Sequence, residues 1–120
     1  MKRIEAIIRK TKFEEVKDAL HEADIDFFSF WEVRGIGQAR QGRIYRGVVY
    51  DTGSIERILI SIVVREKNLK KTIDTILNSA RTGEIGDGRI FVMPVDNSYR
   101  IRTGESGDDT LYIKDEEKIK

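Results

Sequence analysis

Segments with the hydrophobic period of a β-strand alternate along this chain with segments that have the period of an α-helix, and this order restricts the possible folds. Residues 2–9, 25–34, 57–64 and 89–95 carry the alternating, β-branched or aromatic residues that are typical of strands. A helical period follows the first of these segments, and another follows the third. The expected apolar faces are Phe13, Val16, Leu20 and Ala23 in the first helix and Leu69, Ile73, Ile76, Leu77 and Ala80 in the second.

Short motifs mark the ends of these elements. Thr11 and Glu14 have the spacing of a capping box, which predicts that the first helix begins there. Asn68 is expected to cap the second helix, and Gly83 is expected to follow its end. After the last long strand, residues 99–103 are expected to form a further short strand.

The resulting order, β-α-β-β-α-β, predicts an α+β ferredoxin-like sandwich. Two helices cover only one face of such a sheet, so the other face must meet water or a further copy of the chain. The aromatic residues expected to favour self-association are Phe27, Phe28, Phe30, Trp31 and Phe91. We therefore expect the open sheet face to pack against other subunits.

The composition of this 120-residue chain fits one domain and excludes several protein classes. There is no cysteine, so disulfides and thiolate metal sites are excluded. The 22 Lys and Arg residues nearly balance 21 Asp and Glu residues, which argues against nucleic-acid binding through a strong positive field. The first residues do not resemble a secretory signal and no apolar run is long enough to span a bilayer, so we expect a cytoplasmic protein.

Residues 38–54, between the second and third strands, read as a long loop. Gly42, Gly47 and Gly53 punctuate this segment, and its Tyr and Arg residues are of the types that dominate binding hot spots. Long loops in compact domains are usually functional or disordered. We expect an exposed, mobile loop or extended hairpin that binds a partner, and the alternative is a flexible hairpin without one.

Glycines and arginines suggest an anion site in three further segments. Residues 82–89 hold three glycines before Arg89, a composition that can present backbone N–H groups to phosphate, although a helix cap and a turn would explain Gly83 alone. Arg100 and Arg102 would point to one face of the predicted strand 99–103, where they suit a polyphosphate or merely protect a sheet edge. Gly35-Ile36-Gly37 would let a backbone approach a ligand or simply turn.

Together these segments resemble the PII family of nitrogen-regulatory signal-transduction proteins over residues 1–109. The strongest match is residues 80–92, close to the family's C-terminal signature, and residues 101–105 also match. Tyr45-Arg46-Gly47, followed by Tyr50, resembles the middle of the family's T-loop.

The resemblance implies one PII-like domain over residues 1–109, with residues 38–54 as the T-loop and 110–120 as a charged C-terminal tail. It also implies a homotrimer in which ATP and ADP compete for the clefts between subunits. The residues that match the nucleotide site are Ile7, Ser29, Gly35, Gly37, Gln38, Ser61, Val63, Gly86, Asp87, Gly88, Arg89, Arg100 and Arg102. Arg100 and Arg102 are expected from the neighbouring subunit.

The resemblance further implies a regulator without catalytic or resident metal residues, which binds target proteins through its T-loop. The matching T-loop residues are Arg43, Tyr45, Arg46, Gly47 and Tyr50, of which Tyr50 aligns with a tyrosine that some members have uridylylated. The implied partners are an ammonium transporter, through which alone the chain would meet a membrane, or an enzyme of nitrogen metabolism.

Departures from the family pattern leave some properties open. Ala39 stands where a glutamine usually helps to hold Mg²⁺ and 2-oxoglutarate, so binding of that pair stays open. Arg57 and Arg89 stand where the family usually has lysine, which keeps the charge but changes its geometry.

Other functions remain as alternatives. They are a nucleotide sensor with a target outside nitrogen metabolism and a weak ATPase. An enzyme on this fold is disfavoured because His21 is the only histidine and no nucleophile–base set accompanies it. An RNA-recognition module is disfavoured because residues 57–64 lack the aromatic side chains of that motif.

Overall fold

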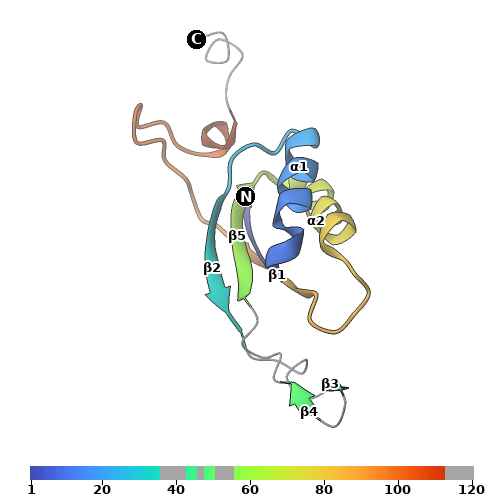
Figure 1. Ribbon diagram of the computed structural model, residues 1–120. Coiled ribbons are helices and arrows are strands. Elements are labelled where there is room, and N and C mark those ends of the chain that lie inside the picture. The colour runs from blue at the N-terminus through green and yellow to red at the C-terminus, as the bar shows by residue number, and fades with distance from the viewer. Residues whose placement is uncertain (36–42, 46–47, 51–55, 113–120) are drawn as a thin grey trace.

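Four antiparallel strands form one sheet, and two helices cover one of its faces (Figure 1). The computed structural model describes residues 1–35, 43–45, 48–50 and 56–112. The sheet order is β2-β5-β1-β6, and its strands are β1 (Lys2–Arg9), β2 (Ser29–Arg34), β5 (Glu56–Val64) and β6 (Gly88–Pro94). The helices are α1 (Phe13–Glu22) and α2 (Glu66–Ala80). This arrangement confirms the predicted ferredoxin-like fold.

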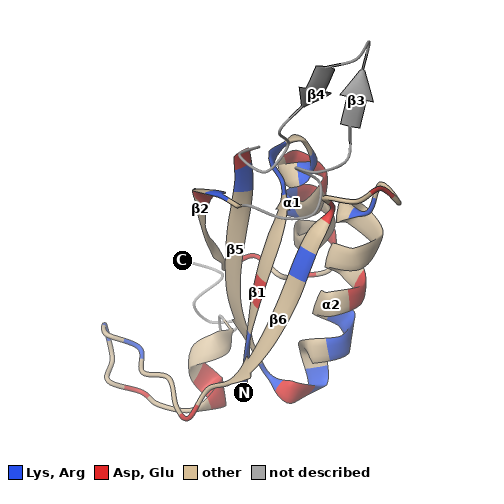
Figure 2. Cartoon of the chain, turned by 90° about the horizontal axis from the view of Figure 1, so that it is seen from below, with Lys and Arg blue, Asp and Glu red and all other residues tan. Residues whose placement is uncertain are grey.

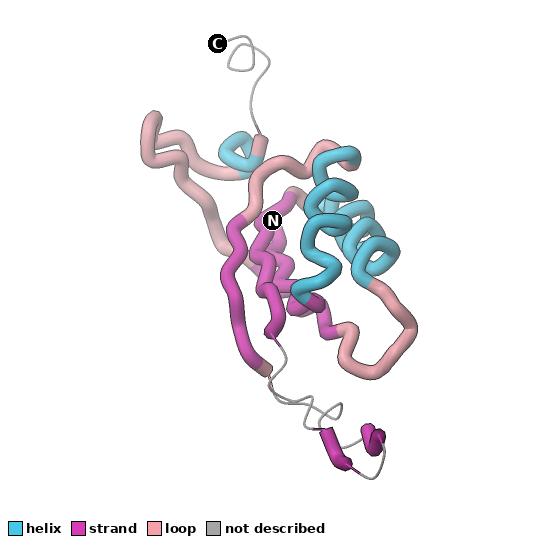
Figure 3. Tube along the Cα trace, viewed as in Figure 1, coloured by secondary structure: helices cyan, strands magenta, loops and turns pink. Residues whose placement is uncertain are grey.

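Even-numbered residues of the central strands face the helices and build the core. Ala6 pairs with Ile60 in the register of β1 and β5, and both residues are fully buried. The helices contribute Val16, Leu20 and Ile76 to the same cluster. Because successive strand residues point to opposite faces, the odd-numbered residues form a second face that the helices do not cover (Figure 3).

Both predicted helix caps are wrong. A 3-10 turn over Lys10–Lys12 runs directly into α1, so Thr11 lies within that turn and caps nothing with its side chain. The N-cap residue of α2 is Arg65, whose extended backbone leads out of β5, and the helix has already begun when the chain reaches Asn68. Thus α2 begins before its predicted cap, whereas α1 begins at Phe13, after a 3-10 turn that contains its predicted cap.

The aromatic residues divide between the two faces of the sheet, contrary to the expectation of one aromatic face. Phe30 pairs with the buried Ile60 in register and lies 4.6 Å from Phe13 of α1, ring centre to ring centre, so it belongs to the helix side. Trp31 and Phe91 are the aromatic residues at odd positions of β2 and β6, and each is close to half exposed. The strand itself begins at Ser29, after a buried Ile25 that follows α1.

The chain between β2 and β5 contains a small hairpin. Strands β3 (Arg43–Tyr45) and β4 (Val48–Tyr50) pair antiparallel, with Arg43 opposite Tyr50. This agrees with the extended-hairpin version of the prediction. The remainder of the predicted T-loop, including Gln38, Arg46 and Gly47, lies outside the described residues, and so does Gly37 before it.

The segment after β6 departs from the prediction of a short strand at 99–103. Tyr99 makes a single bridge to Ser106, and residues 101–103 form a turn that is closed by the Gly104 N–H donating to Arg100 O at 2.7 Å. Ile101 is fully exposed on this turn. A 3-10 helix (Asp108–Leu111) follows, so regular structure runs past the expected domain end at 109. The rest of the predicted tail, 113–120, lies outside the described residues.

Candidate functional site

The glycine-rich loop before β6 is organised around the carboxylate of Asp87. One oxygen, Oδ1, accepts from Arg9 Nε at 3.0 Å and from the Thr82 hydroxyl. The other, Oδ2, accepts from the backbone N–H groups of Thr82 and Gly83, each at 2.9 Å. Arg9 also donates to Ile85 O at 3.1 Å. These hydrogen bonds hold the loop in a defined conformation and bind it to the end of β1.

These contacts keep Asp87 ionised. Partial burial favours the protonated form, but the hydrogen bonds from Thr82, Arg9 and Gly83 outweigh it and hold the pKa of Asp87 far below its usual range. The folded protein therefore binds a proton at this carboxylate less readily than the unfolded chain does.

The stability that Asp87 contributes should depend on pH with a defined sign. Because the pKa is lowered by folding, the contribution is fully present above about pH 4, the ordinary aspartate value, and is lost as the pH falls below it. We expect Asp87→Asn to be less stable than the wild type near neutrality, with the two converging in acid. Urea unfolding of both proteins between about pH 7 and pH 3 measures this, and a gap that is constant with pH would contradict it.

Gly88 begins β6 where only glycine fits. Its φ is +105°, and a Cβ built there would lie 1.7 Å from Ile7 O and 2.8 Å from Ile7 C. The close approach locks the end of the loop against β1. It also sets the direction in which Arg89, the next residue, leaves the loop.

Two arginines lie side by side at this end of the open sheet face. Arg9 of β1 and Arg57 of β5 are opposite one another in register. Arg57 is only 9% exposed, and its Nη1 has no hydrogen-bond partner among the residues that the structure describes. Burial and then the charge of Arg9 lower the pKa of Arg57, while the charge of Asp87 acts in the opposite direction. A buried cationic donor without an acceptor is suited to an anionic ligand.

Five of the residues predicted for the nucleotide site lie together on the same open face. Ser29 pairs with Ser61 in register, so their side chains are neighbours across β2 and β5. Val63 lies two residues along β5, and Ile7 pairs with Arg89 across β1 and β6. The structure thus brings these five residues to one face. Gly35, just after β2, has no atom of the described residues within 4 Å of where a Cβ would lie.

The predicted arginine pair has a different arrangement from the one expected. Arg100 donates through Nη2 to the carbonyl oxygens of Asp109, at 3.1 Å, and Tyr112, at 2.9 Å. Arg102 is exposed within the turn after it. No strand forms at 99–103, so the prediction that both side chains share a strand face is wrong. Contact of either with a phosphate stays a prediction.

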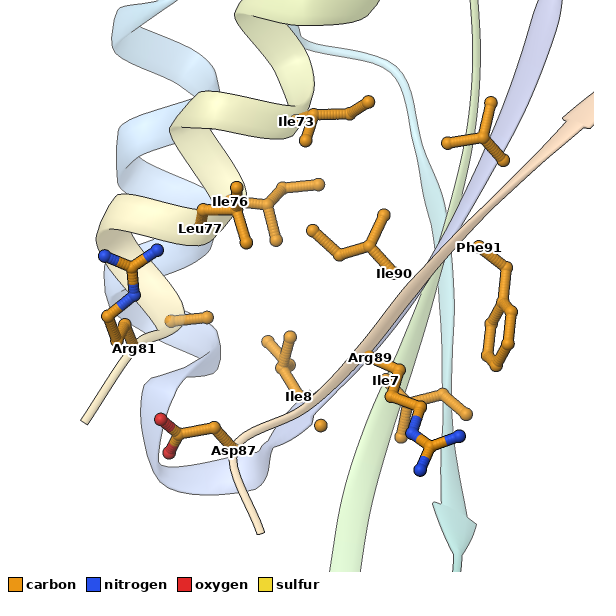
Figure 4. Close-up of a pocket in the computed structure, with 13 residues that line it drawn as sticks. Ile7, Ile8, Ile73, Ile76, Leu77, Arg81, Asp87, Arg89, Ile90 and Phe91 are labelled. Atoms are coloured by element: carbon orange, nitrogen blue, oxygen red, sulfur yellow. The ribbon is translucent and has the colours of Figure 1, made fainter. Parts of the chain in front are cut away.

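A groove of about 460 Å³ lies between α2 and β6, and it is chiefly apolar (Figure 4). Ile73, Ile76 and Leu77 line its helix side, and Ile90 lies across from them. Figure 4 shows Arg89 and Phe91 pointing to the opposite side of β6. The groove therefore borders the glycine-rich loop but is not lined by Ser29 or Ser61, two of the residues predicted for the nucleotide site.

Ion pairs tie together the strand ends from which the hairpin segment leaves. Lys10 Nζ lies 2.8 Å from Glu32 Oε1 and 3.1 Å from Glu56 Oε2, and Arg34 Nη2 lies 3.5 Å from Glu56 Oε1. Figure 2 shows charged residues at the neighbouring ends of β2 and β5. These groups are largely exposed, so they orient the strand ends more than they stabilise the fold.

Sequence reasoning missed Arg9 and the part played by Thr82, and it noted Arg57 only as a departure from lysine. The signal for Arg9 and Arg57 was available, since two arginines at the ends of paired strands share a face once the register is known. The contacts of Thr82 depend on the loop conformation and have no sequence signal. None of the helices in the described residues is long and apolar enough to cross a membrane.

Known proteins of one family match this chain over the sheet, the helices and the glycine-rich loop. The family model for nitrogen regulatory protein P-II matches residues 1–105. Nitrogen regulatory protein P-II of Synechocystis sp. is 46% identical over 112 residues, which cover 92% of this chain and all of that protein. The proteins of the same name from Microchaete diplosiphon and Azospirillum brasilense are 44% and 42% identical over the same lengths.

These relatives are named as regulatory proteins, which confirms the prediction of a regulator rather than a metabolic enzyme. The match covers the sheet, both helices and the glycine-rich loop. The chain therefore belongs to the nitrogen regulatory protein P-II family.

Proposed function

We propose that this protein regulates nitrogen metabolism by sensing ATP and ADP as a homotrimer. The observation that carries the nucleotide part is the buried Arg57 Nη1, which has no partner among the described residues and lies opposite Arg9. Arg89 brings a third cation to the same face, and the Asp87 carboxylate pairs with Arg9. The balance of charge favours an anion such as a phosphate chain.

The base and sugar would lie further along the open face. Ser29 and Ser61 offer paired hydroxyl groups there, and Ile7 and Val63 offer apolar surface. A single subunit leaves this face open, so a nucleotide on it would be half in water. A neighbouring subunit would close the site, and Arg102 is the residue that we expect it to bring.

Assembly through the open face is supported by its exposed apolar residues. Trp31 is 46% exposed and Phe91 is 45% exposed, although each lies in the middle of a strand. Large apolar side chains exposed on a sheet are typical of interaction surfaces. The homotrimer would bury them and complete three equivalent nucleotide sites.

The output would pass through the segment between β2 and β5. Its hairpin strands β3 and β4 carry Arg43, Tyr45 and Tyr50, residue types that are frequent at hot spots. An ammonium transporter or an enzyme of nitrogen metabolism is the proposed partner, and 2-oxoglutarate with Mg²⁺ is a proposed further ligand beside bound ATP.

Native mass spectrometry with ATP and with ADP tests this proposal directly. We expect a trimer that takes up to three nucleotides. Arg102→Ala should weaken ATP binding about tenfold or more, because a charge-assisted contact with phosphate is lost. Lys71→Ala, on an exposed helix position, is the matched control and should bind as the wild type does. A monomer, or a trimer that takes up neither nucleotide, would contradict the proposal.

A further inference from the structure

We propose that Asp87 is a positioning residue of the anion site, which shapes the loop of residues 82–88 and holds Arg9 without touching the ligand. This inference rests on the proposed nucleotide function but assigns Asp87 a role different from that of a ligand-binding residue. It is carried by the contacts of the carboxylate and by the segments that these contacts join.

The carboxylate of Asp87 is fully engaged within the chain. Each oxygen accepts two hydrogen bonds, from Arg9 and the Thr82 hydroxyl on Oδ1 and from two backbone N–H groups on Oδ2. Four donors use nearly all the acceptor capacity of an ionised carboxylate. The side chain therefore has little capacity left for a ribose hydroxyl or a ligand-bound cation.

One of these bonds joins the loop to the end of β1, 78 residues away, and the other three close the loop on itself. Arg9 ends β1, Thr82 and Gly83 follow the end of α2, and Asp87 itself precedes Gly88, the first residue of β6. Figure 4 shows the Asp87 side chain directed toward the end of α2, whereas Arg89 points to the other side of the strand. Asp87 thus fixes where the backbone of the loop lies relative to the open face.

Asp87 also controls where the charge of Arg9 is placed. Arg9 Nε binds Asp87 while Arg9 Nη2 binds Ile85 O, so the guanidinium is held at two points. Without the Asp87 carboxylate, Arg9 would face Arg57 across the sheet and lose its ion pair with Asp87. Arg9 and Arg57 would repel one another, and their guanidinium groups would no longer be held in a defined arrangement.

The positioning role makes a prediction opposite in sign to that of a simple nearby charge. An acid that is merely close to bound phosphates repels them, so neutralising it should tighten ATP binding. A positioning acid holds the donors in place, so neutralising it should weaken ATP binding. We expect Asp87→Asn to bind ATP about tenfold more weakly than the wild type, because charge-assisted hydrogen bonds that order the site are lost.

A second pair of variants tests the same hydrogen bonds from the side of Thr82, which donates to Asp87. Thr82→Val removes the hydroxyl that donates to Asp87 while keeping the shape of the side chain. It should also weaken ATP binding, by less than Asp87→Asn does. Thr82→Ser keeps the hydroxyl and should restore most of the affinity lost in Thr82→Val. Asp96→Asn, which removes an exposed acid beyond β6, is the matched charge control.

Two readouts separate positioning from direct contact. Hydrogen exchange of the ligand-free protein should show that the amides of Thr82 and Gly83 lose protection in Asp87→Asn, because both donate to Asp87. Calorimetry with adenosine, which has no phosphate, should show no difference between Asp87→Asn and the wild type. A loss of adenosine affinity would indicate a ribose contact and overturn the inference.

The outcomes also separate this inference from the proposed function. If the wild type binds ATP and Asp87→Asn binds it equally or more tightly, the positioning role is overturned and nucleotide sensing stands. If the wild type binds no ATP, nucleotide sensing fails and the assignment of Asp87 to a ligand site fails with it. If the amides of Thr82 and Gly83 keep their hydrogen-exchange protection in Asp87→Asn, the positioning role of Asp87 is overturned in either case.

Discussion

Gly88→Ala is expected to be the most destabilising single-methyl change in the described part of this chain. The new Cβ would lie 1.7 Å from Ile7 O, a main-chain atom that is held in the β1–β6 ladder. The φ of +105° is also strained for any residue with a Cβ. Strain and overpacking together should cost about 2–6 kcal/mol, which is a large part of the stability of a small domain.

Substitutions at two other glycines separate the cost of backbone strain from the cost of overpacking. Gly83 has a φ of +89° but open space around its Cα, so Gly83→Ala should show the cost of strain alone, about 1–3 kcal/mol. Gly35 has no positive φ, and a Cβ there would meet no atom of the described residues, so Gly35→Ala should leave the stability of the fold nearly unchanged. Thermal or urea unfolding of the three variants gives the comparison. If Gly88→Ala costs no more than Gly83→Ala, the close approach to Ile7 does not exist in solution.

The sheet and helices were predictable because their signals are local. The alternation of Ile4, Ala6 and Ile8 fixes which face of β1 is buried, and the spacing of Val16 and Leu20 fixes the buried side of α1. These patterns depend only on the period of each element, so a single sequence carries them.

The element ends were less predictable, because the preceding strand decides where each helix begins. Thr11 has the right neighbours for a capping box, yet the turn that follows β1 places it inside helical backbone. The strand expected at 99–103 failed for a related reason, since a strand needs a partner edge and this segment reaches away from the sheet (Figure 1).

The candidate site was partly predictable. Composition alone indicated that the loop of residues 82–89 could bind an anion, but it could not separate a ligand-binding acid from one that is bonded within the loop. That distinction depends on the donors around Asp87, which come from β1 and from the end of α2. Likewise, Arg57 becomes a candidate only when the register places it beside Arg9 and burial deprives it of water.

Arg57→Met is expected to have opposite effects on stability and on ligand binding. In the ligand-free protein, Arg57 buries a charged donor that no described residue satisfies, and Arg9 lies opposite it. A buried donor of this kind costs about 1–3 kcal/mol, and methionine fills a similar volume without a charge. The ligand-free variant should therefore unfold at a temperature equal to or higher than that of the wild type.

ATP should bind the same variant more weakly, by about tenfold or more, because the donor that a phosphate or carboxylate would satisfy is gone. Arg57→Lys is the informative intermediate, since it keeps the charge but gives up the planar fork of donors. Differential scanning calorimetry with and without ATP measures both effects in one titration, because a ligand that binds only the folded state raises the unfolding temperature. If Arg57→Met loses stability without ATP and keeps the full ATP-induced rise, Arg57 is a structural residue of the sheet. If the variant is more stable without ATP and shows a smaller ATP-induced rise in unfolding temperature, the buried Arg57 lowers the stability of the ligand-free fold but contributes to ATP binding.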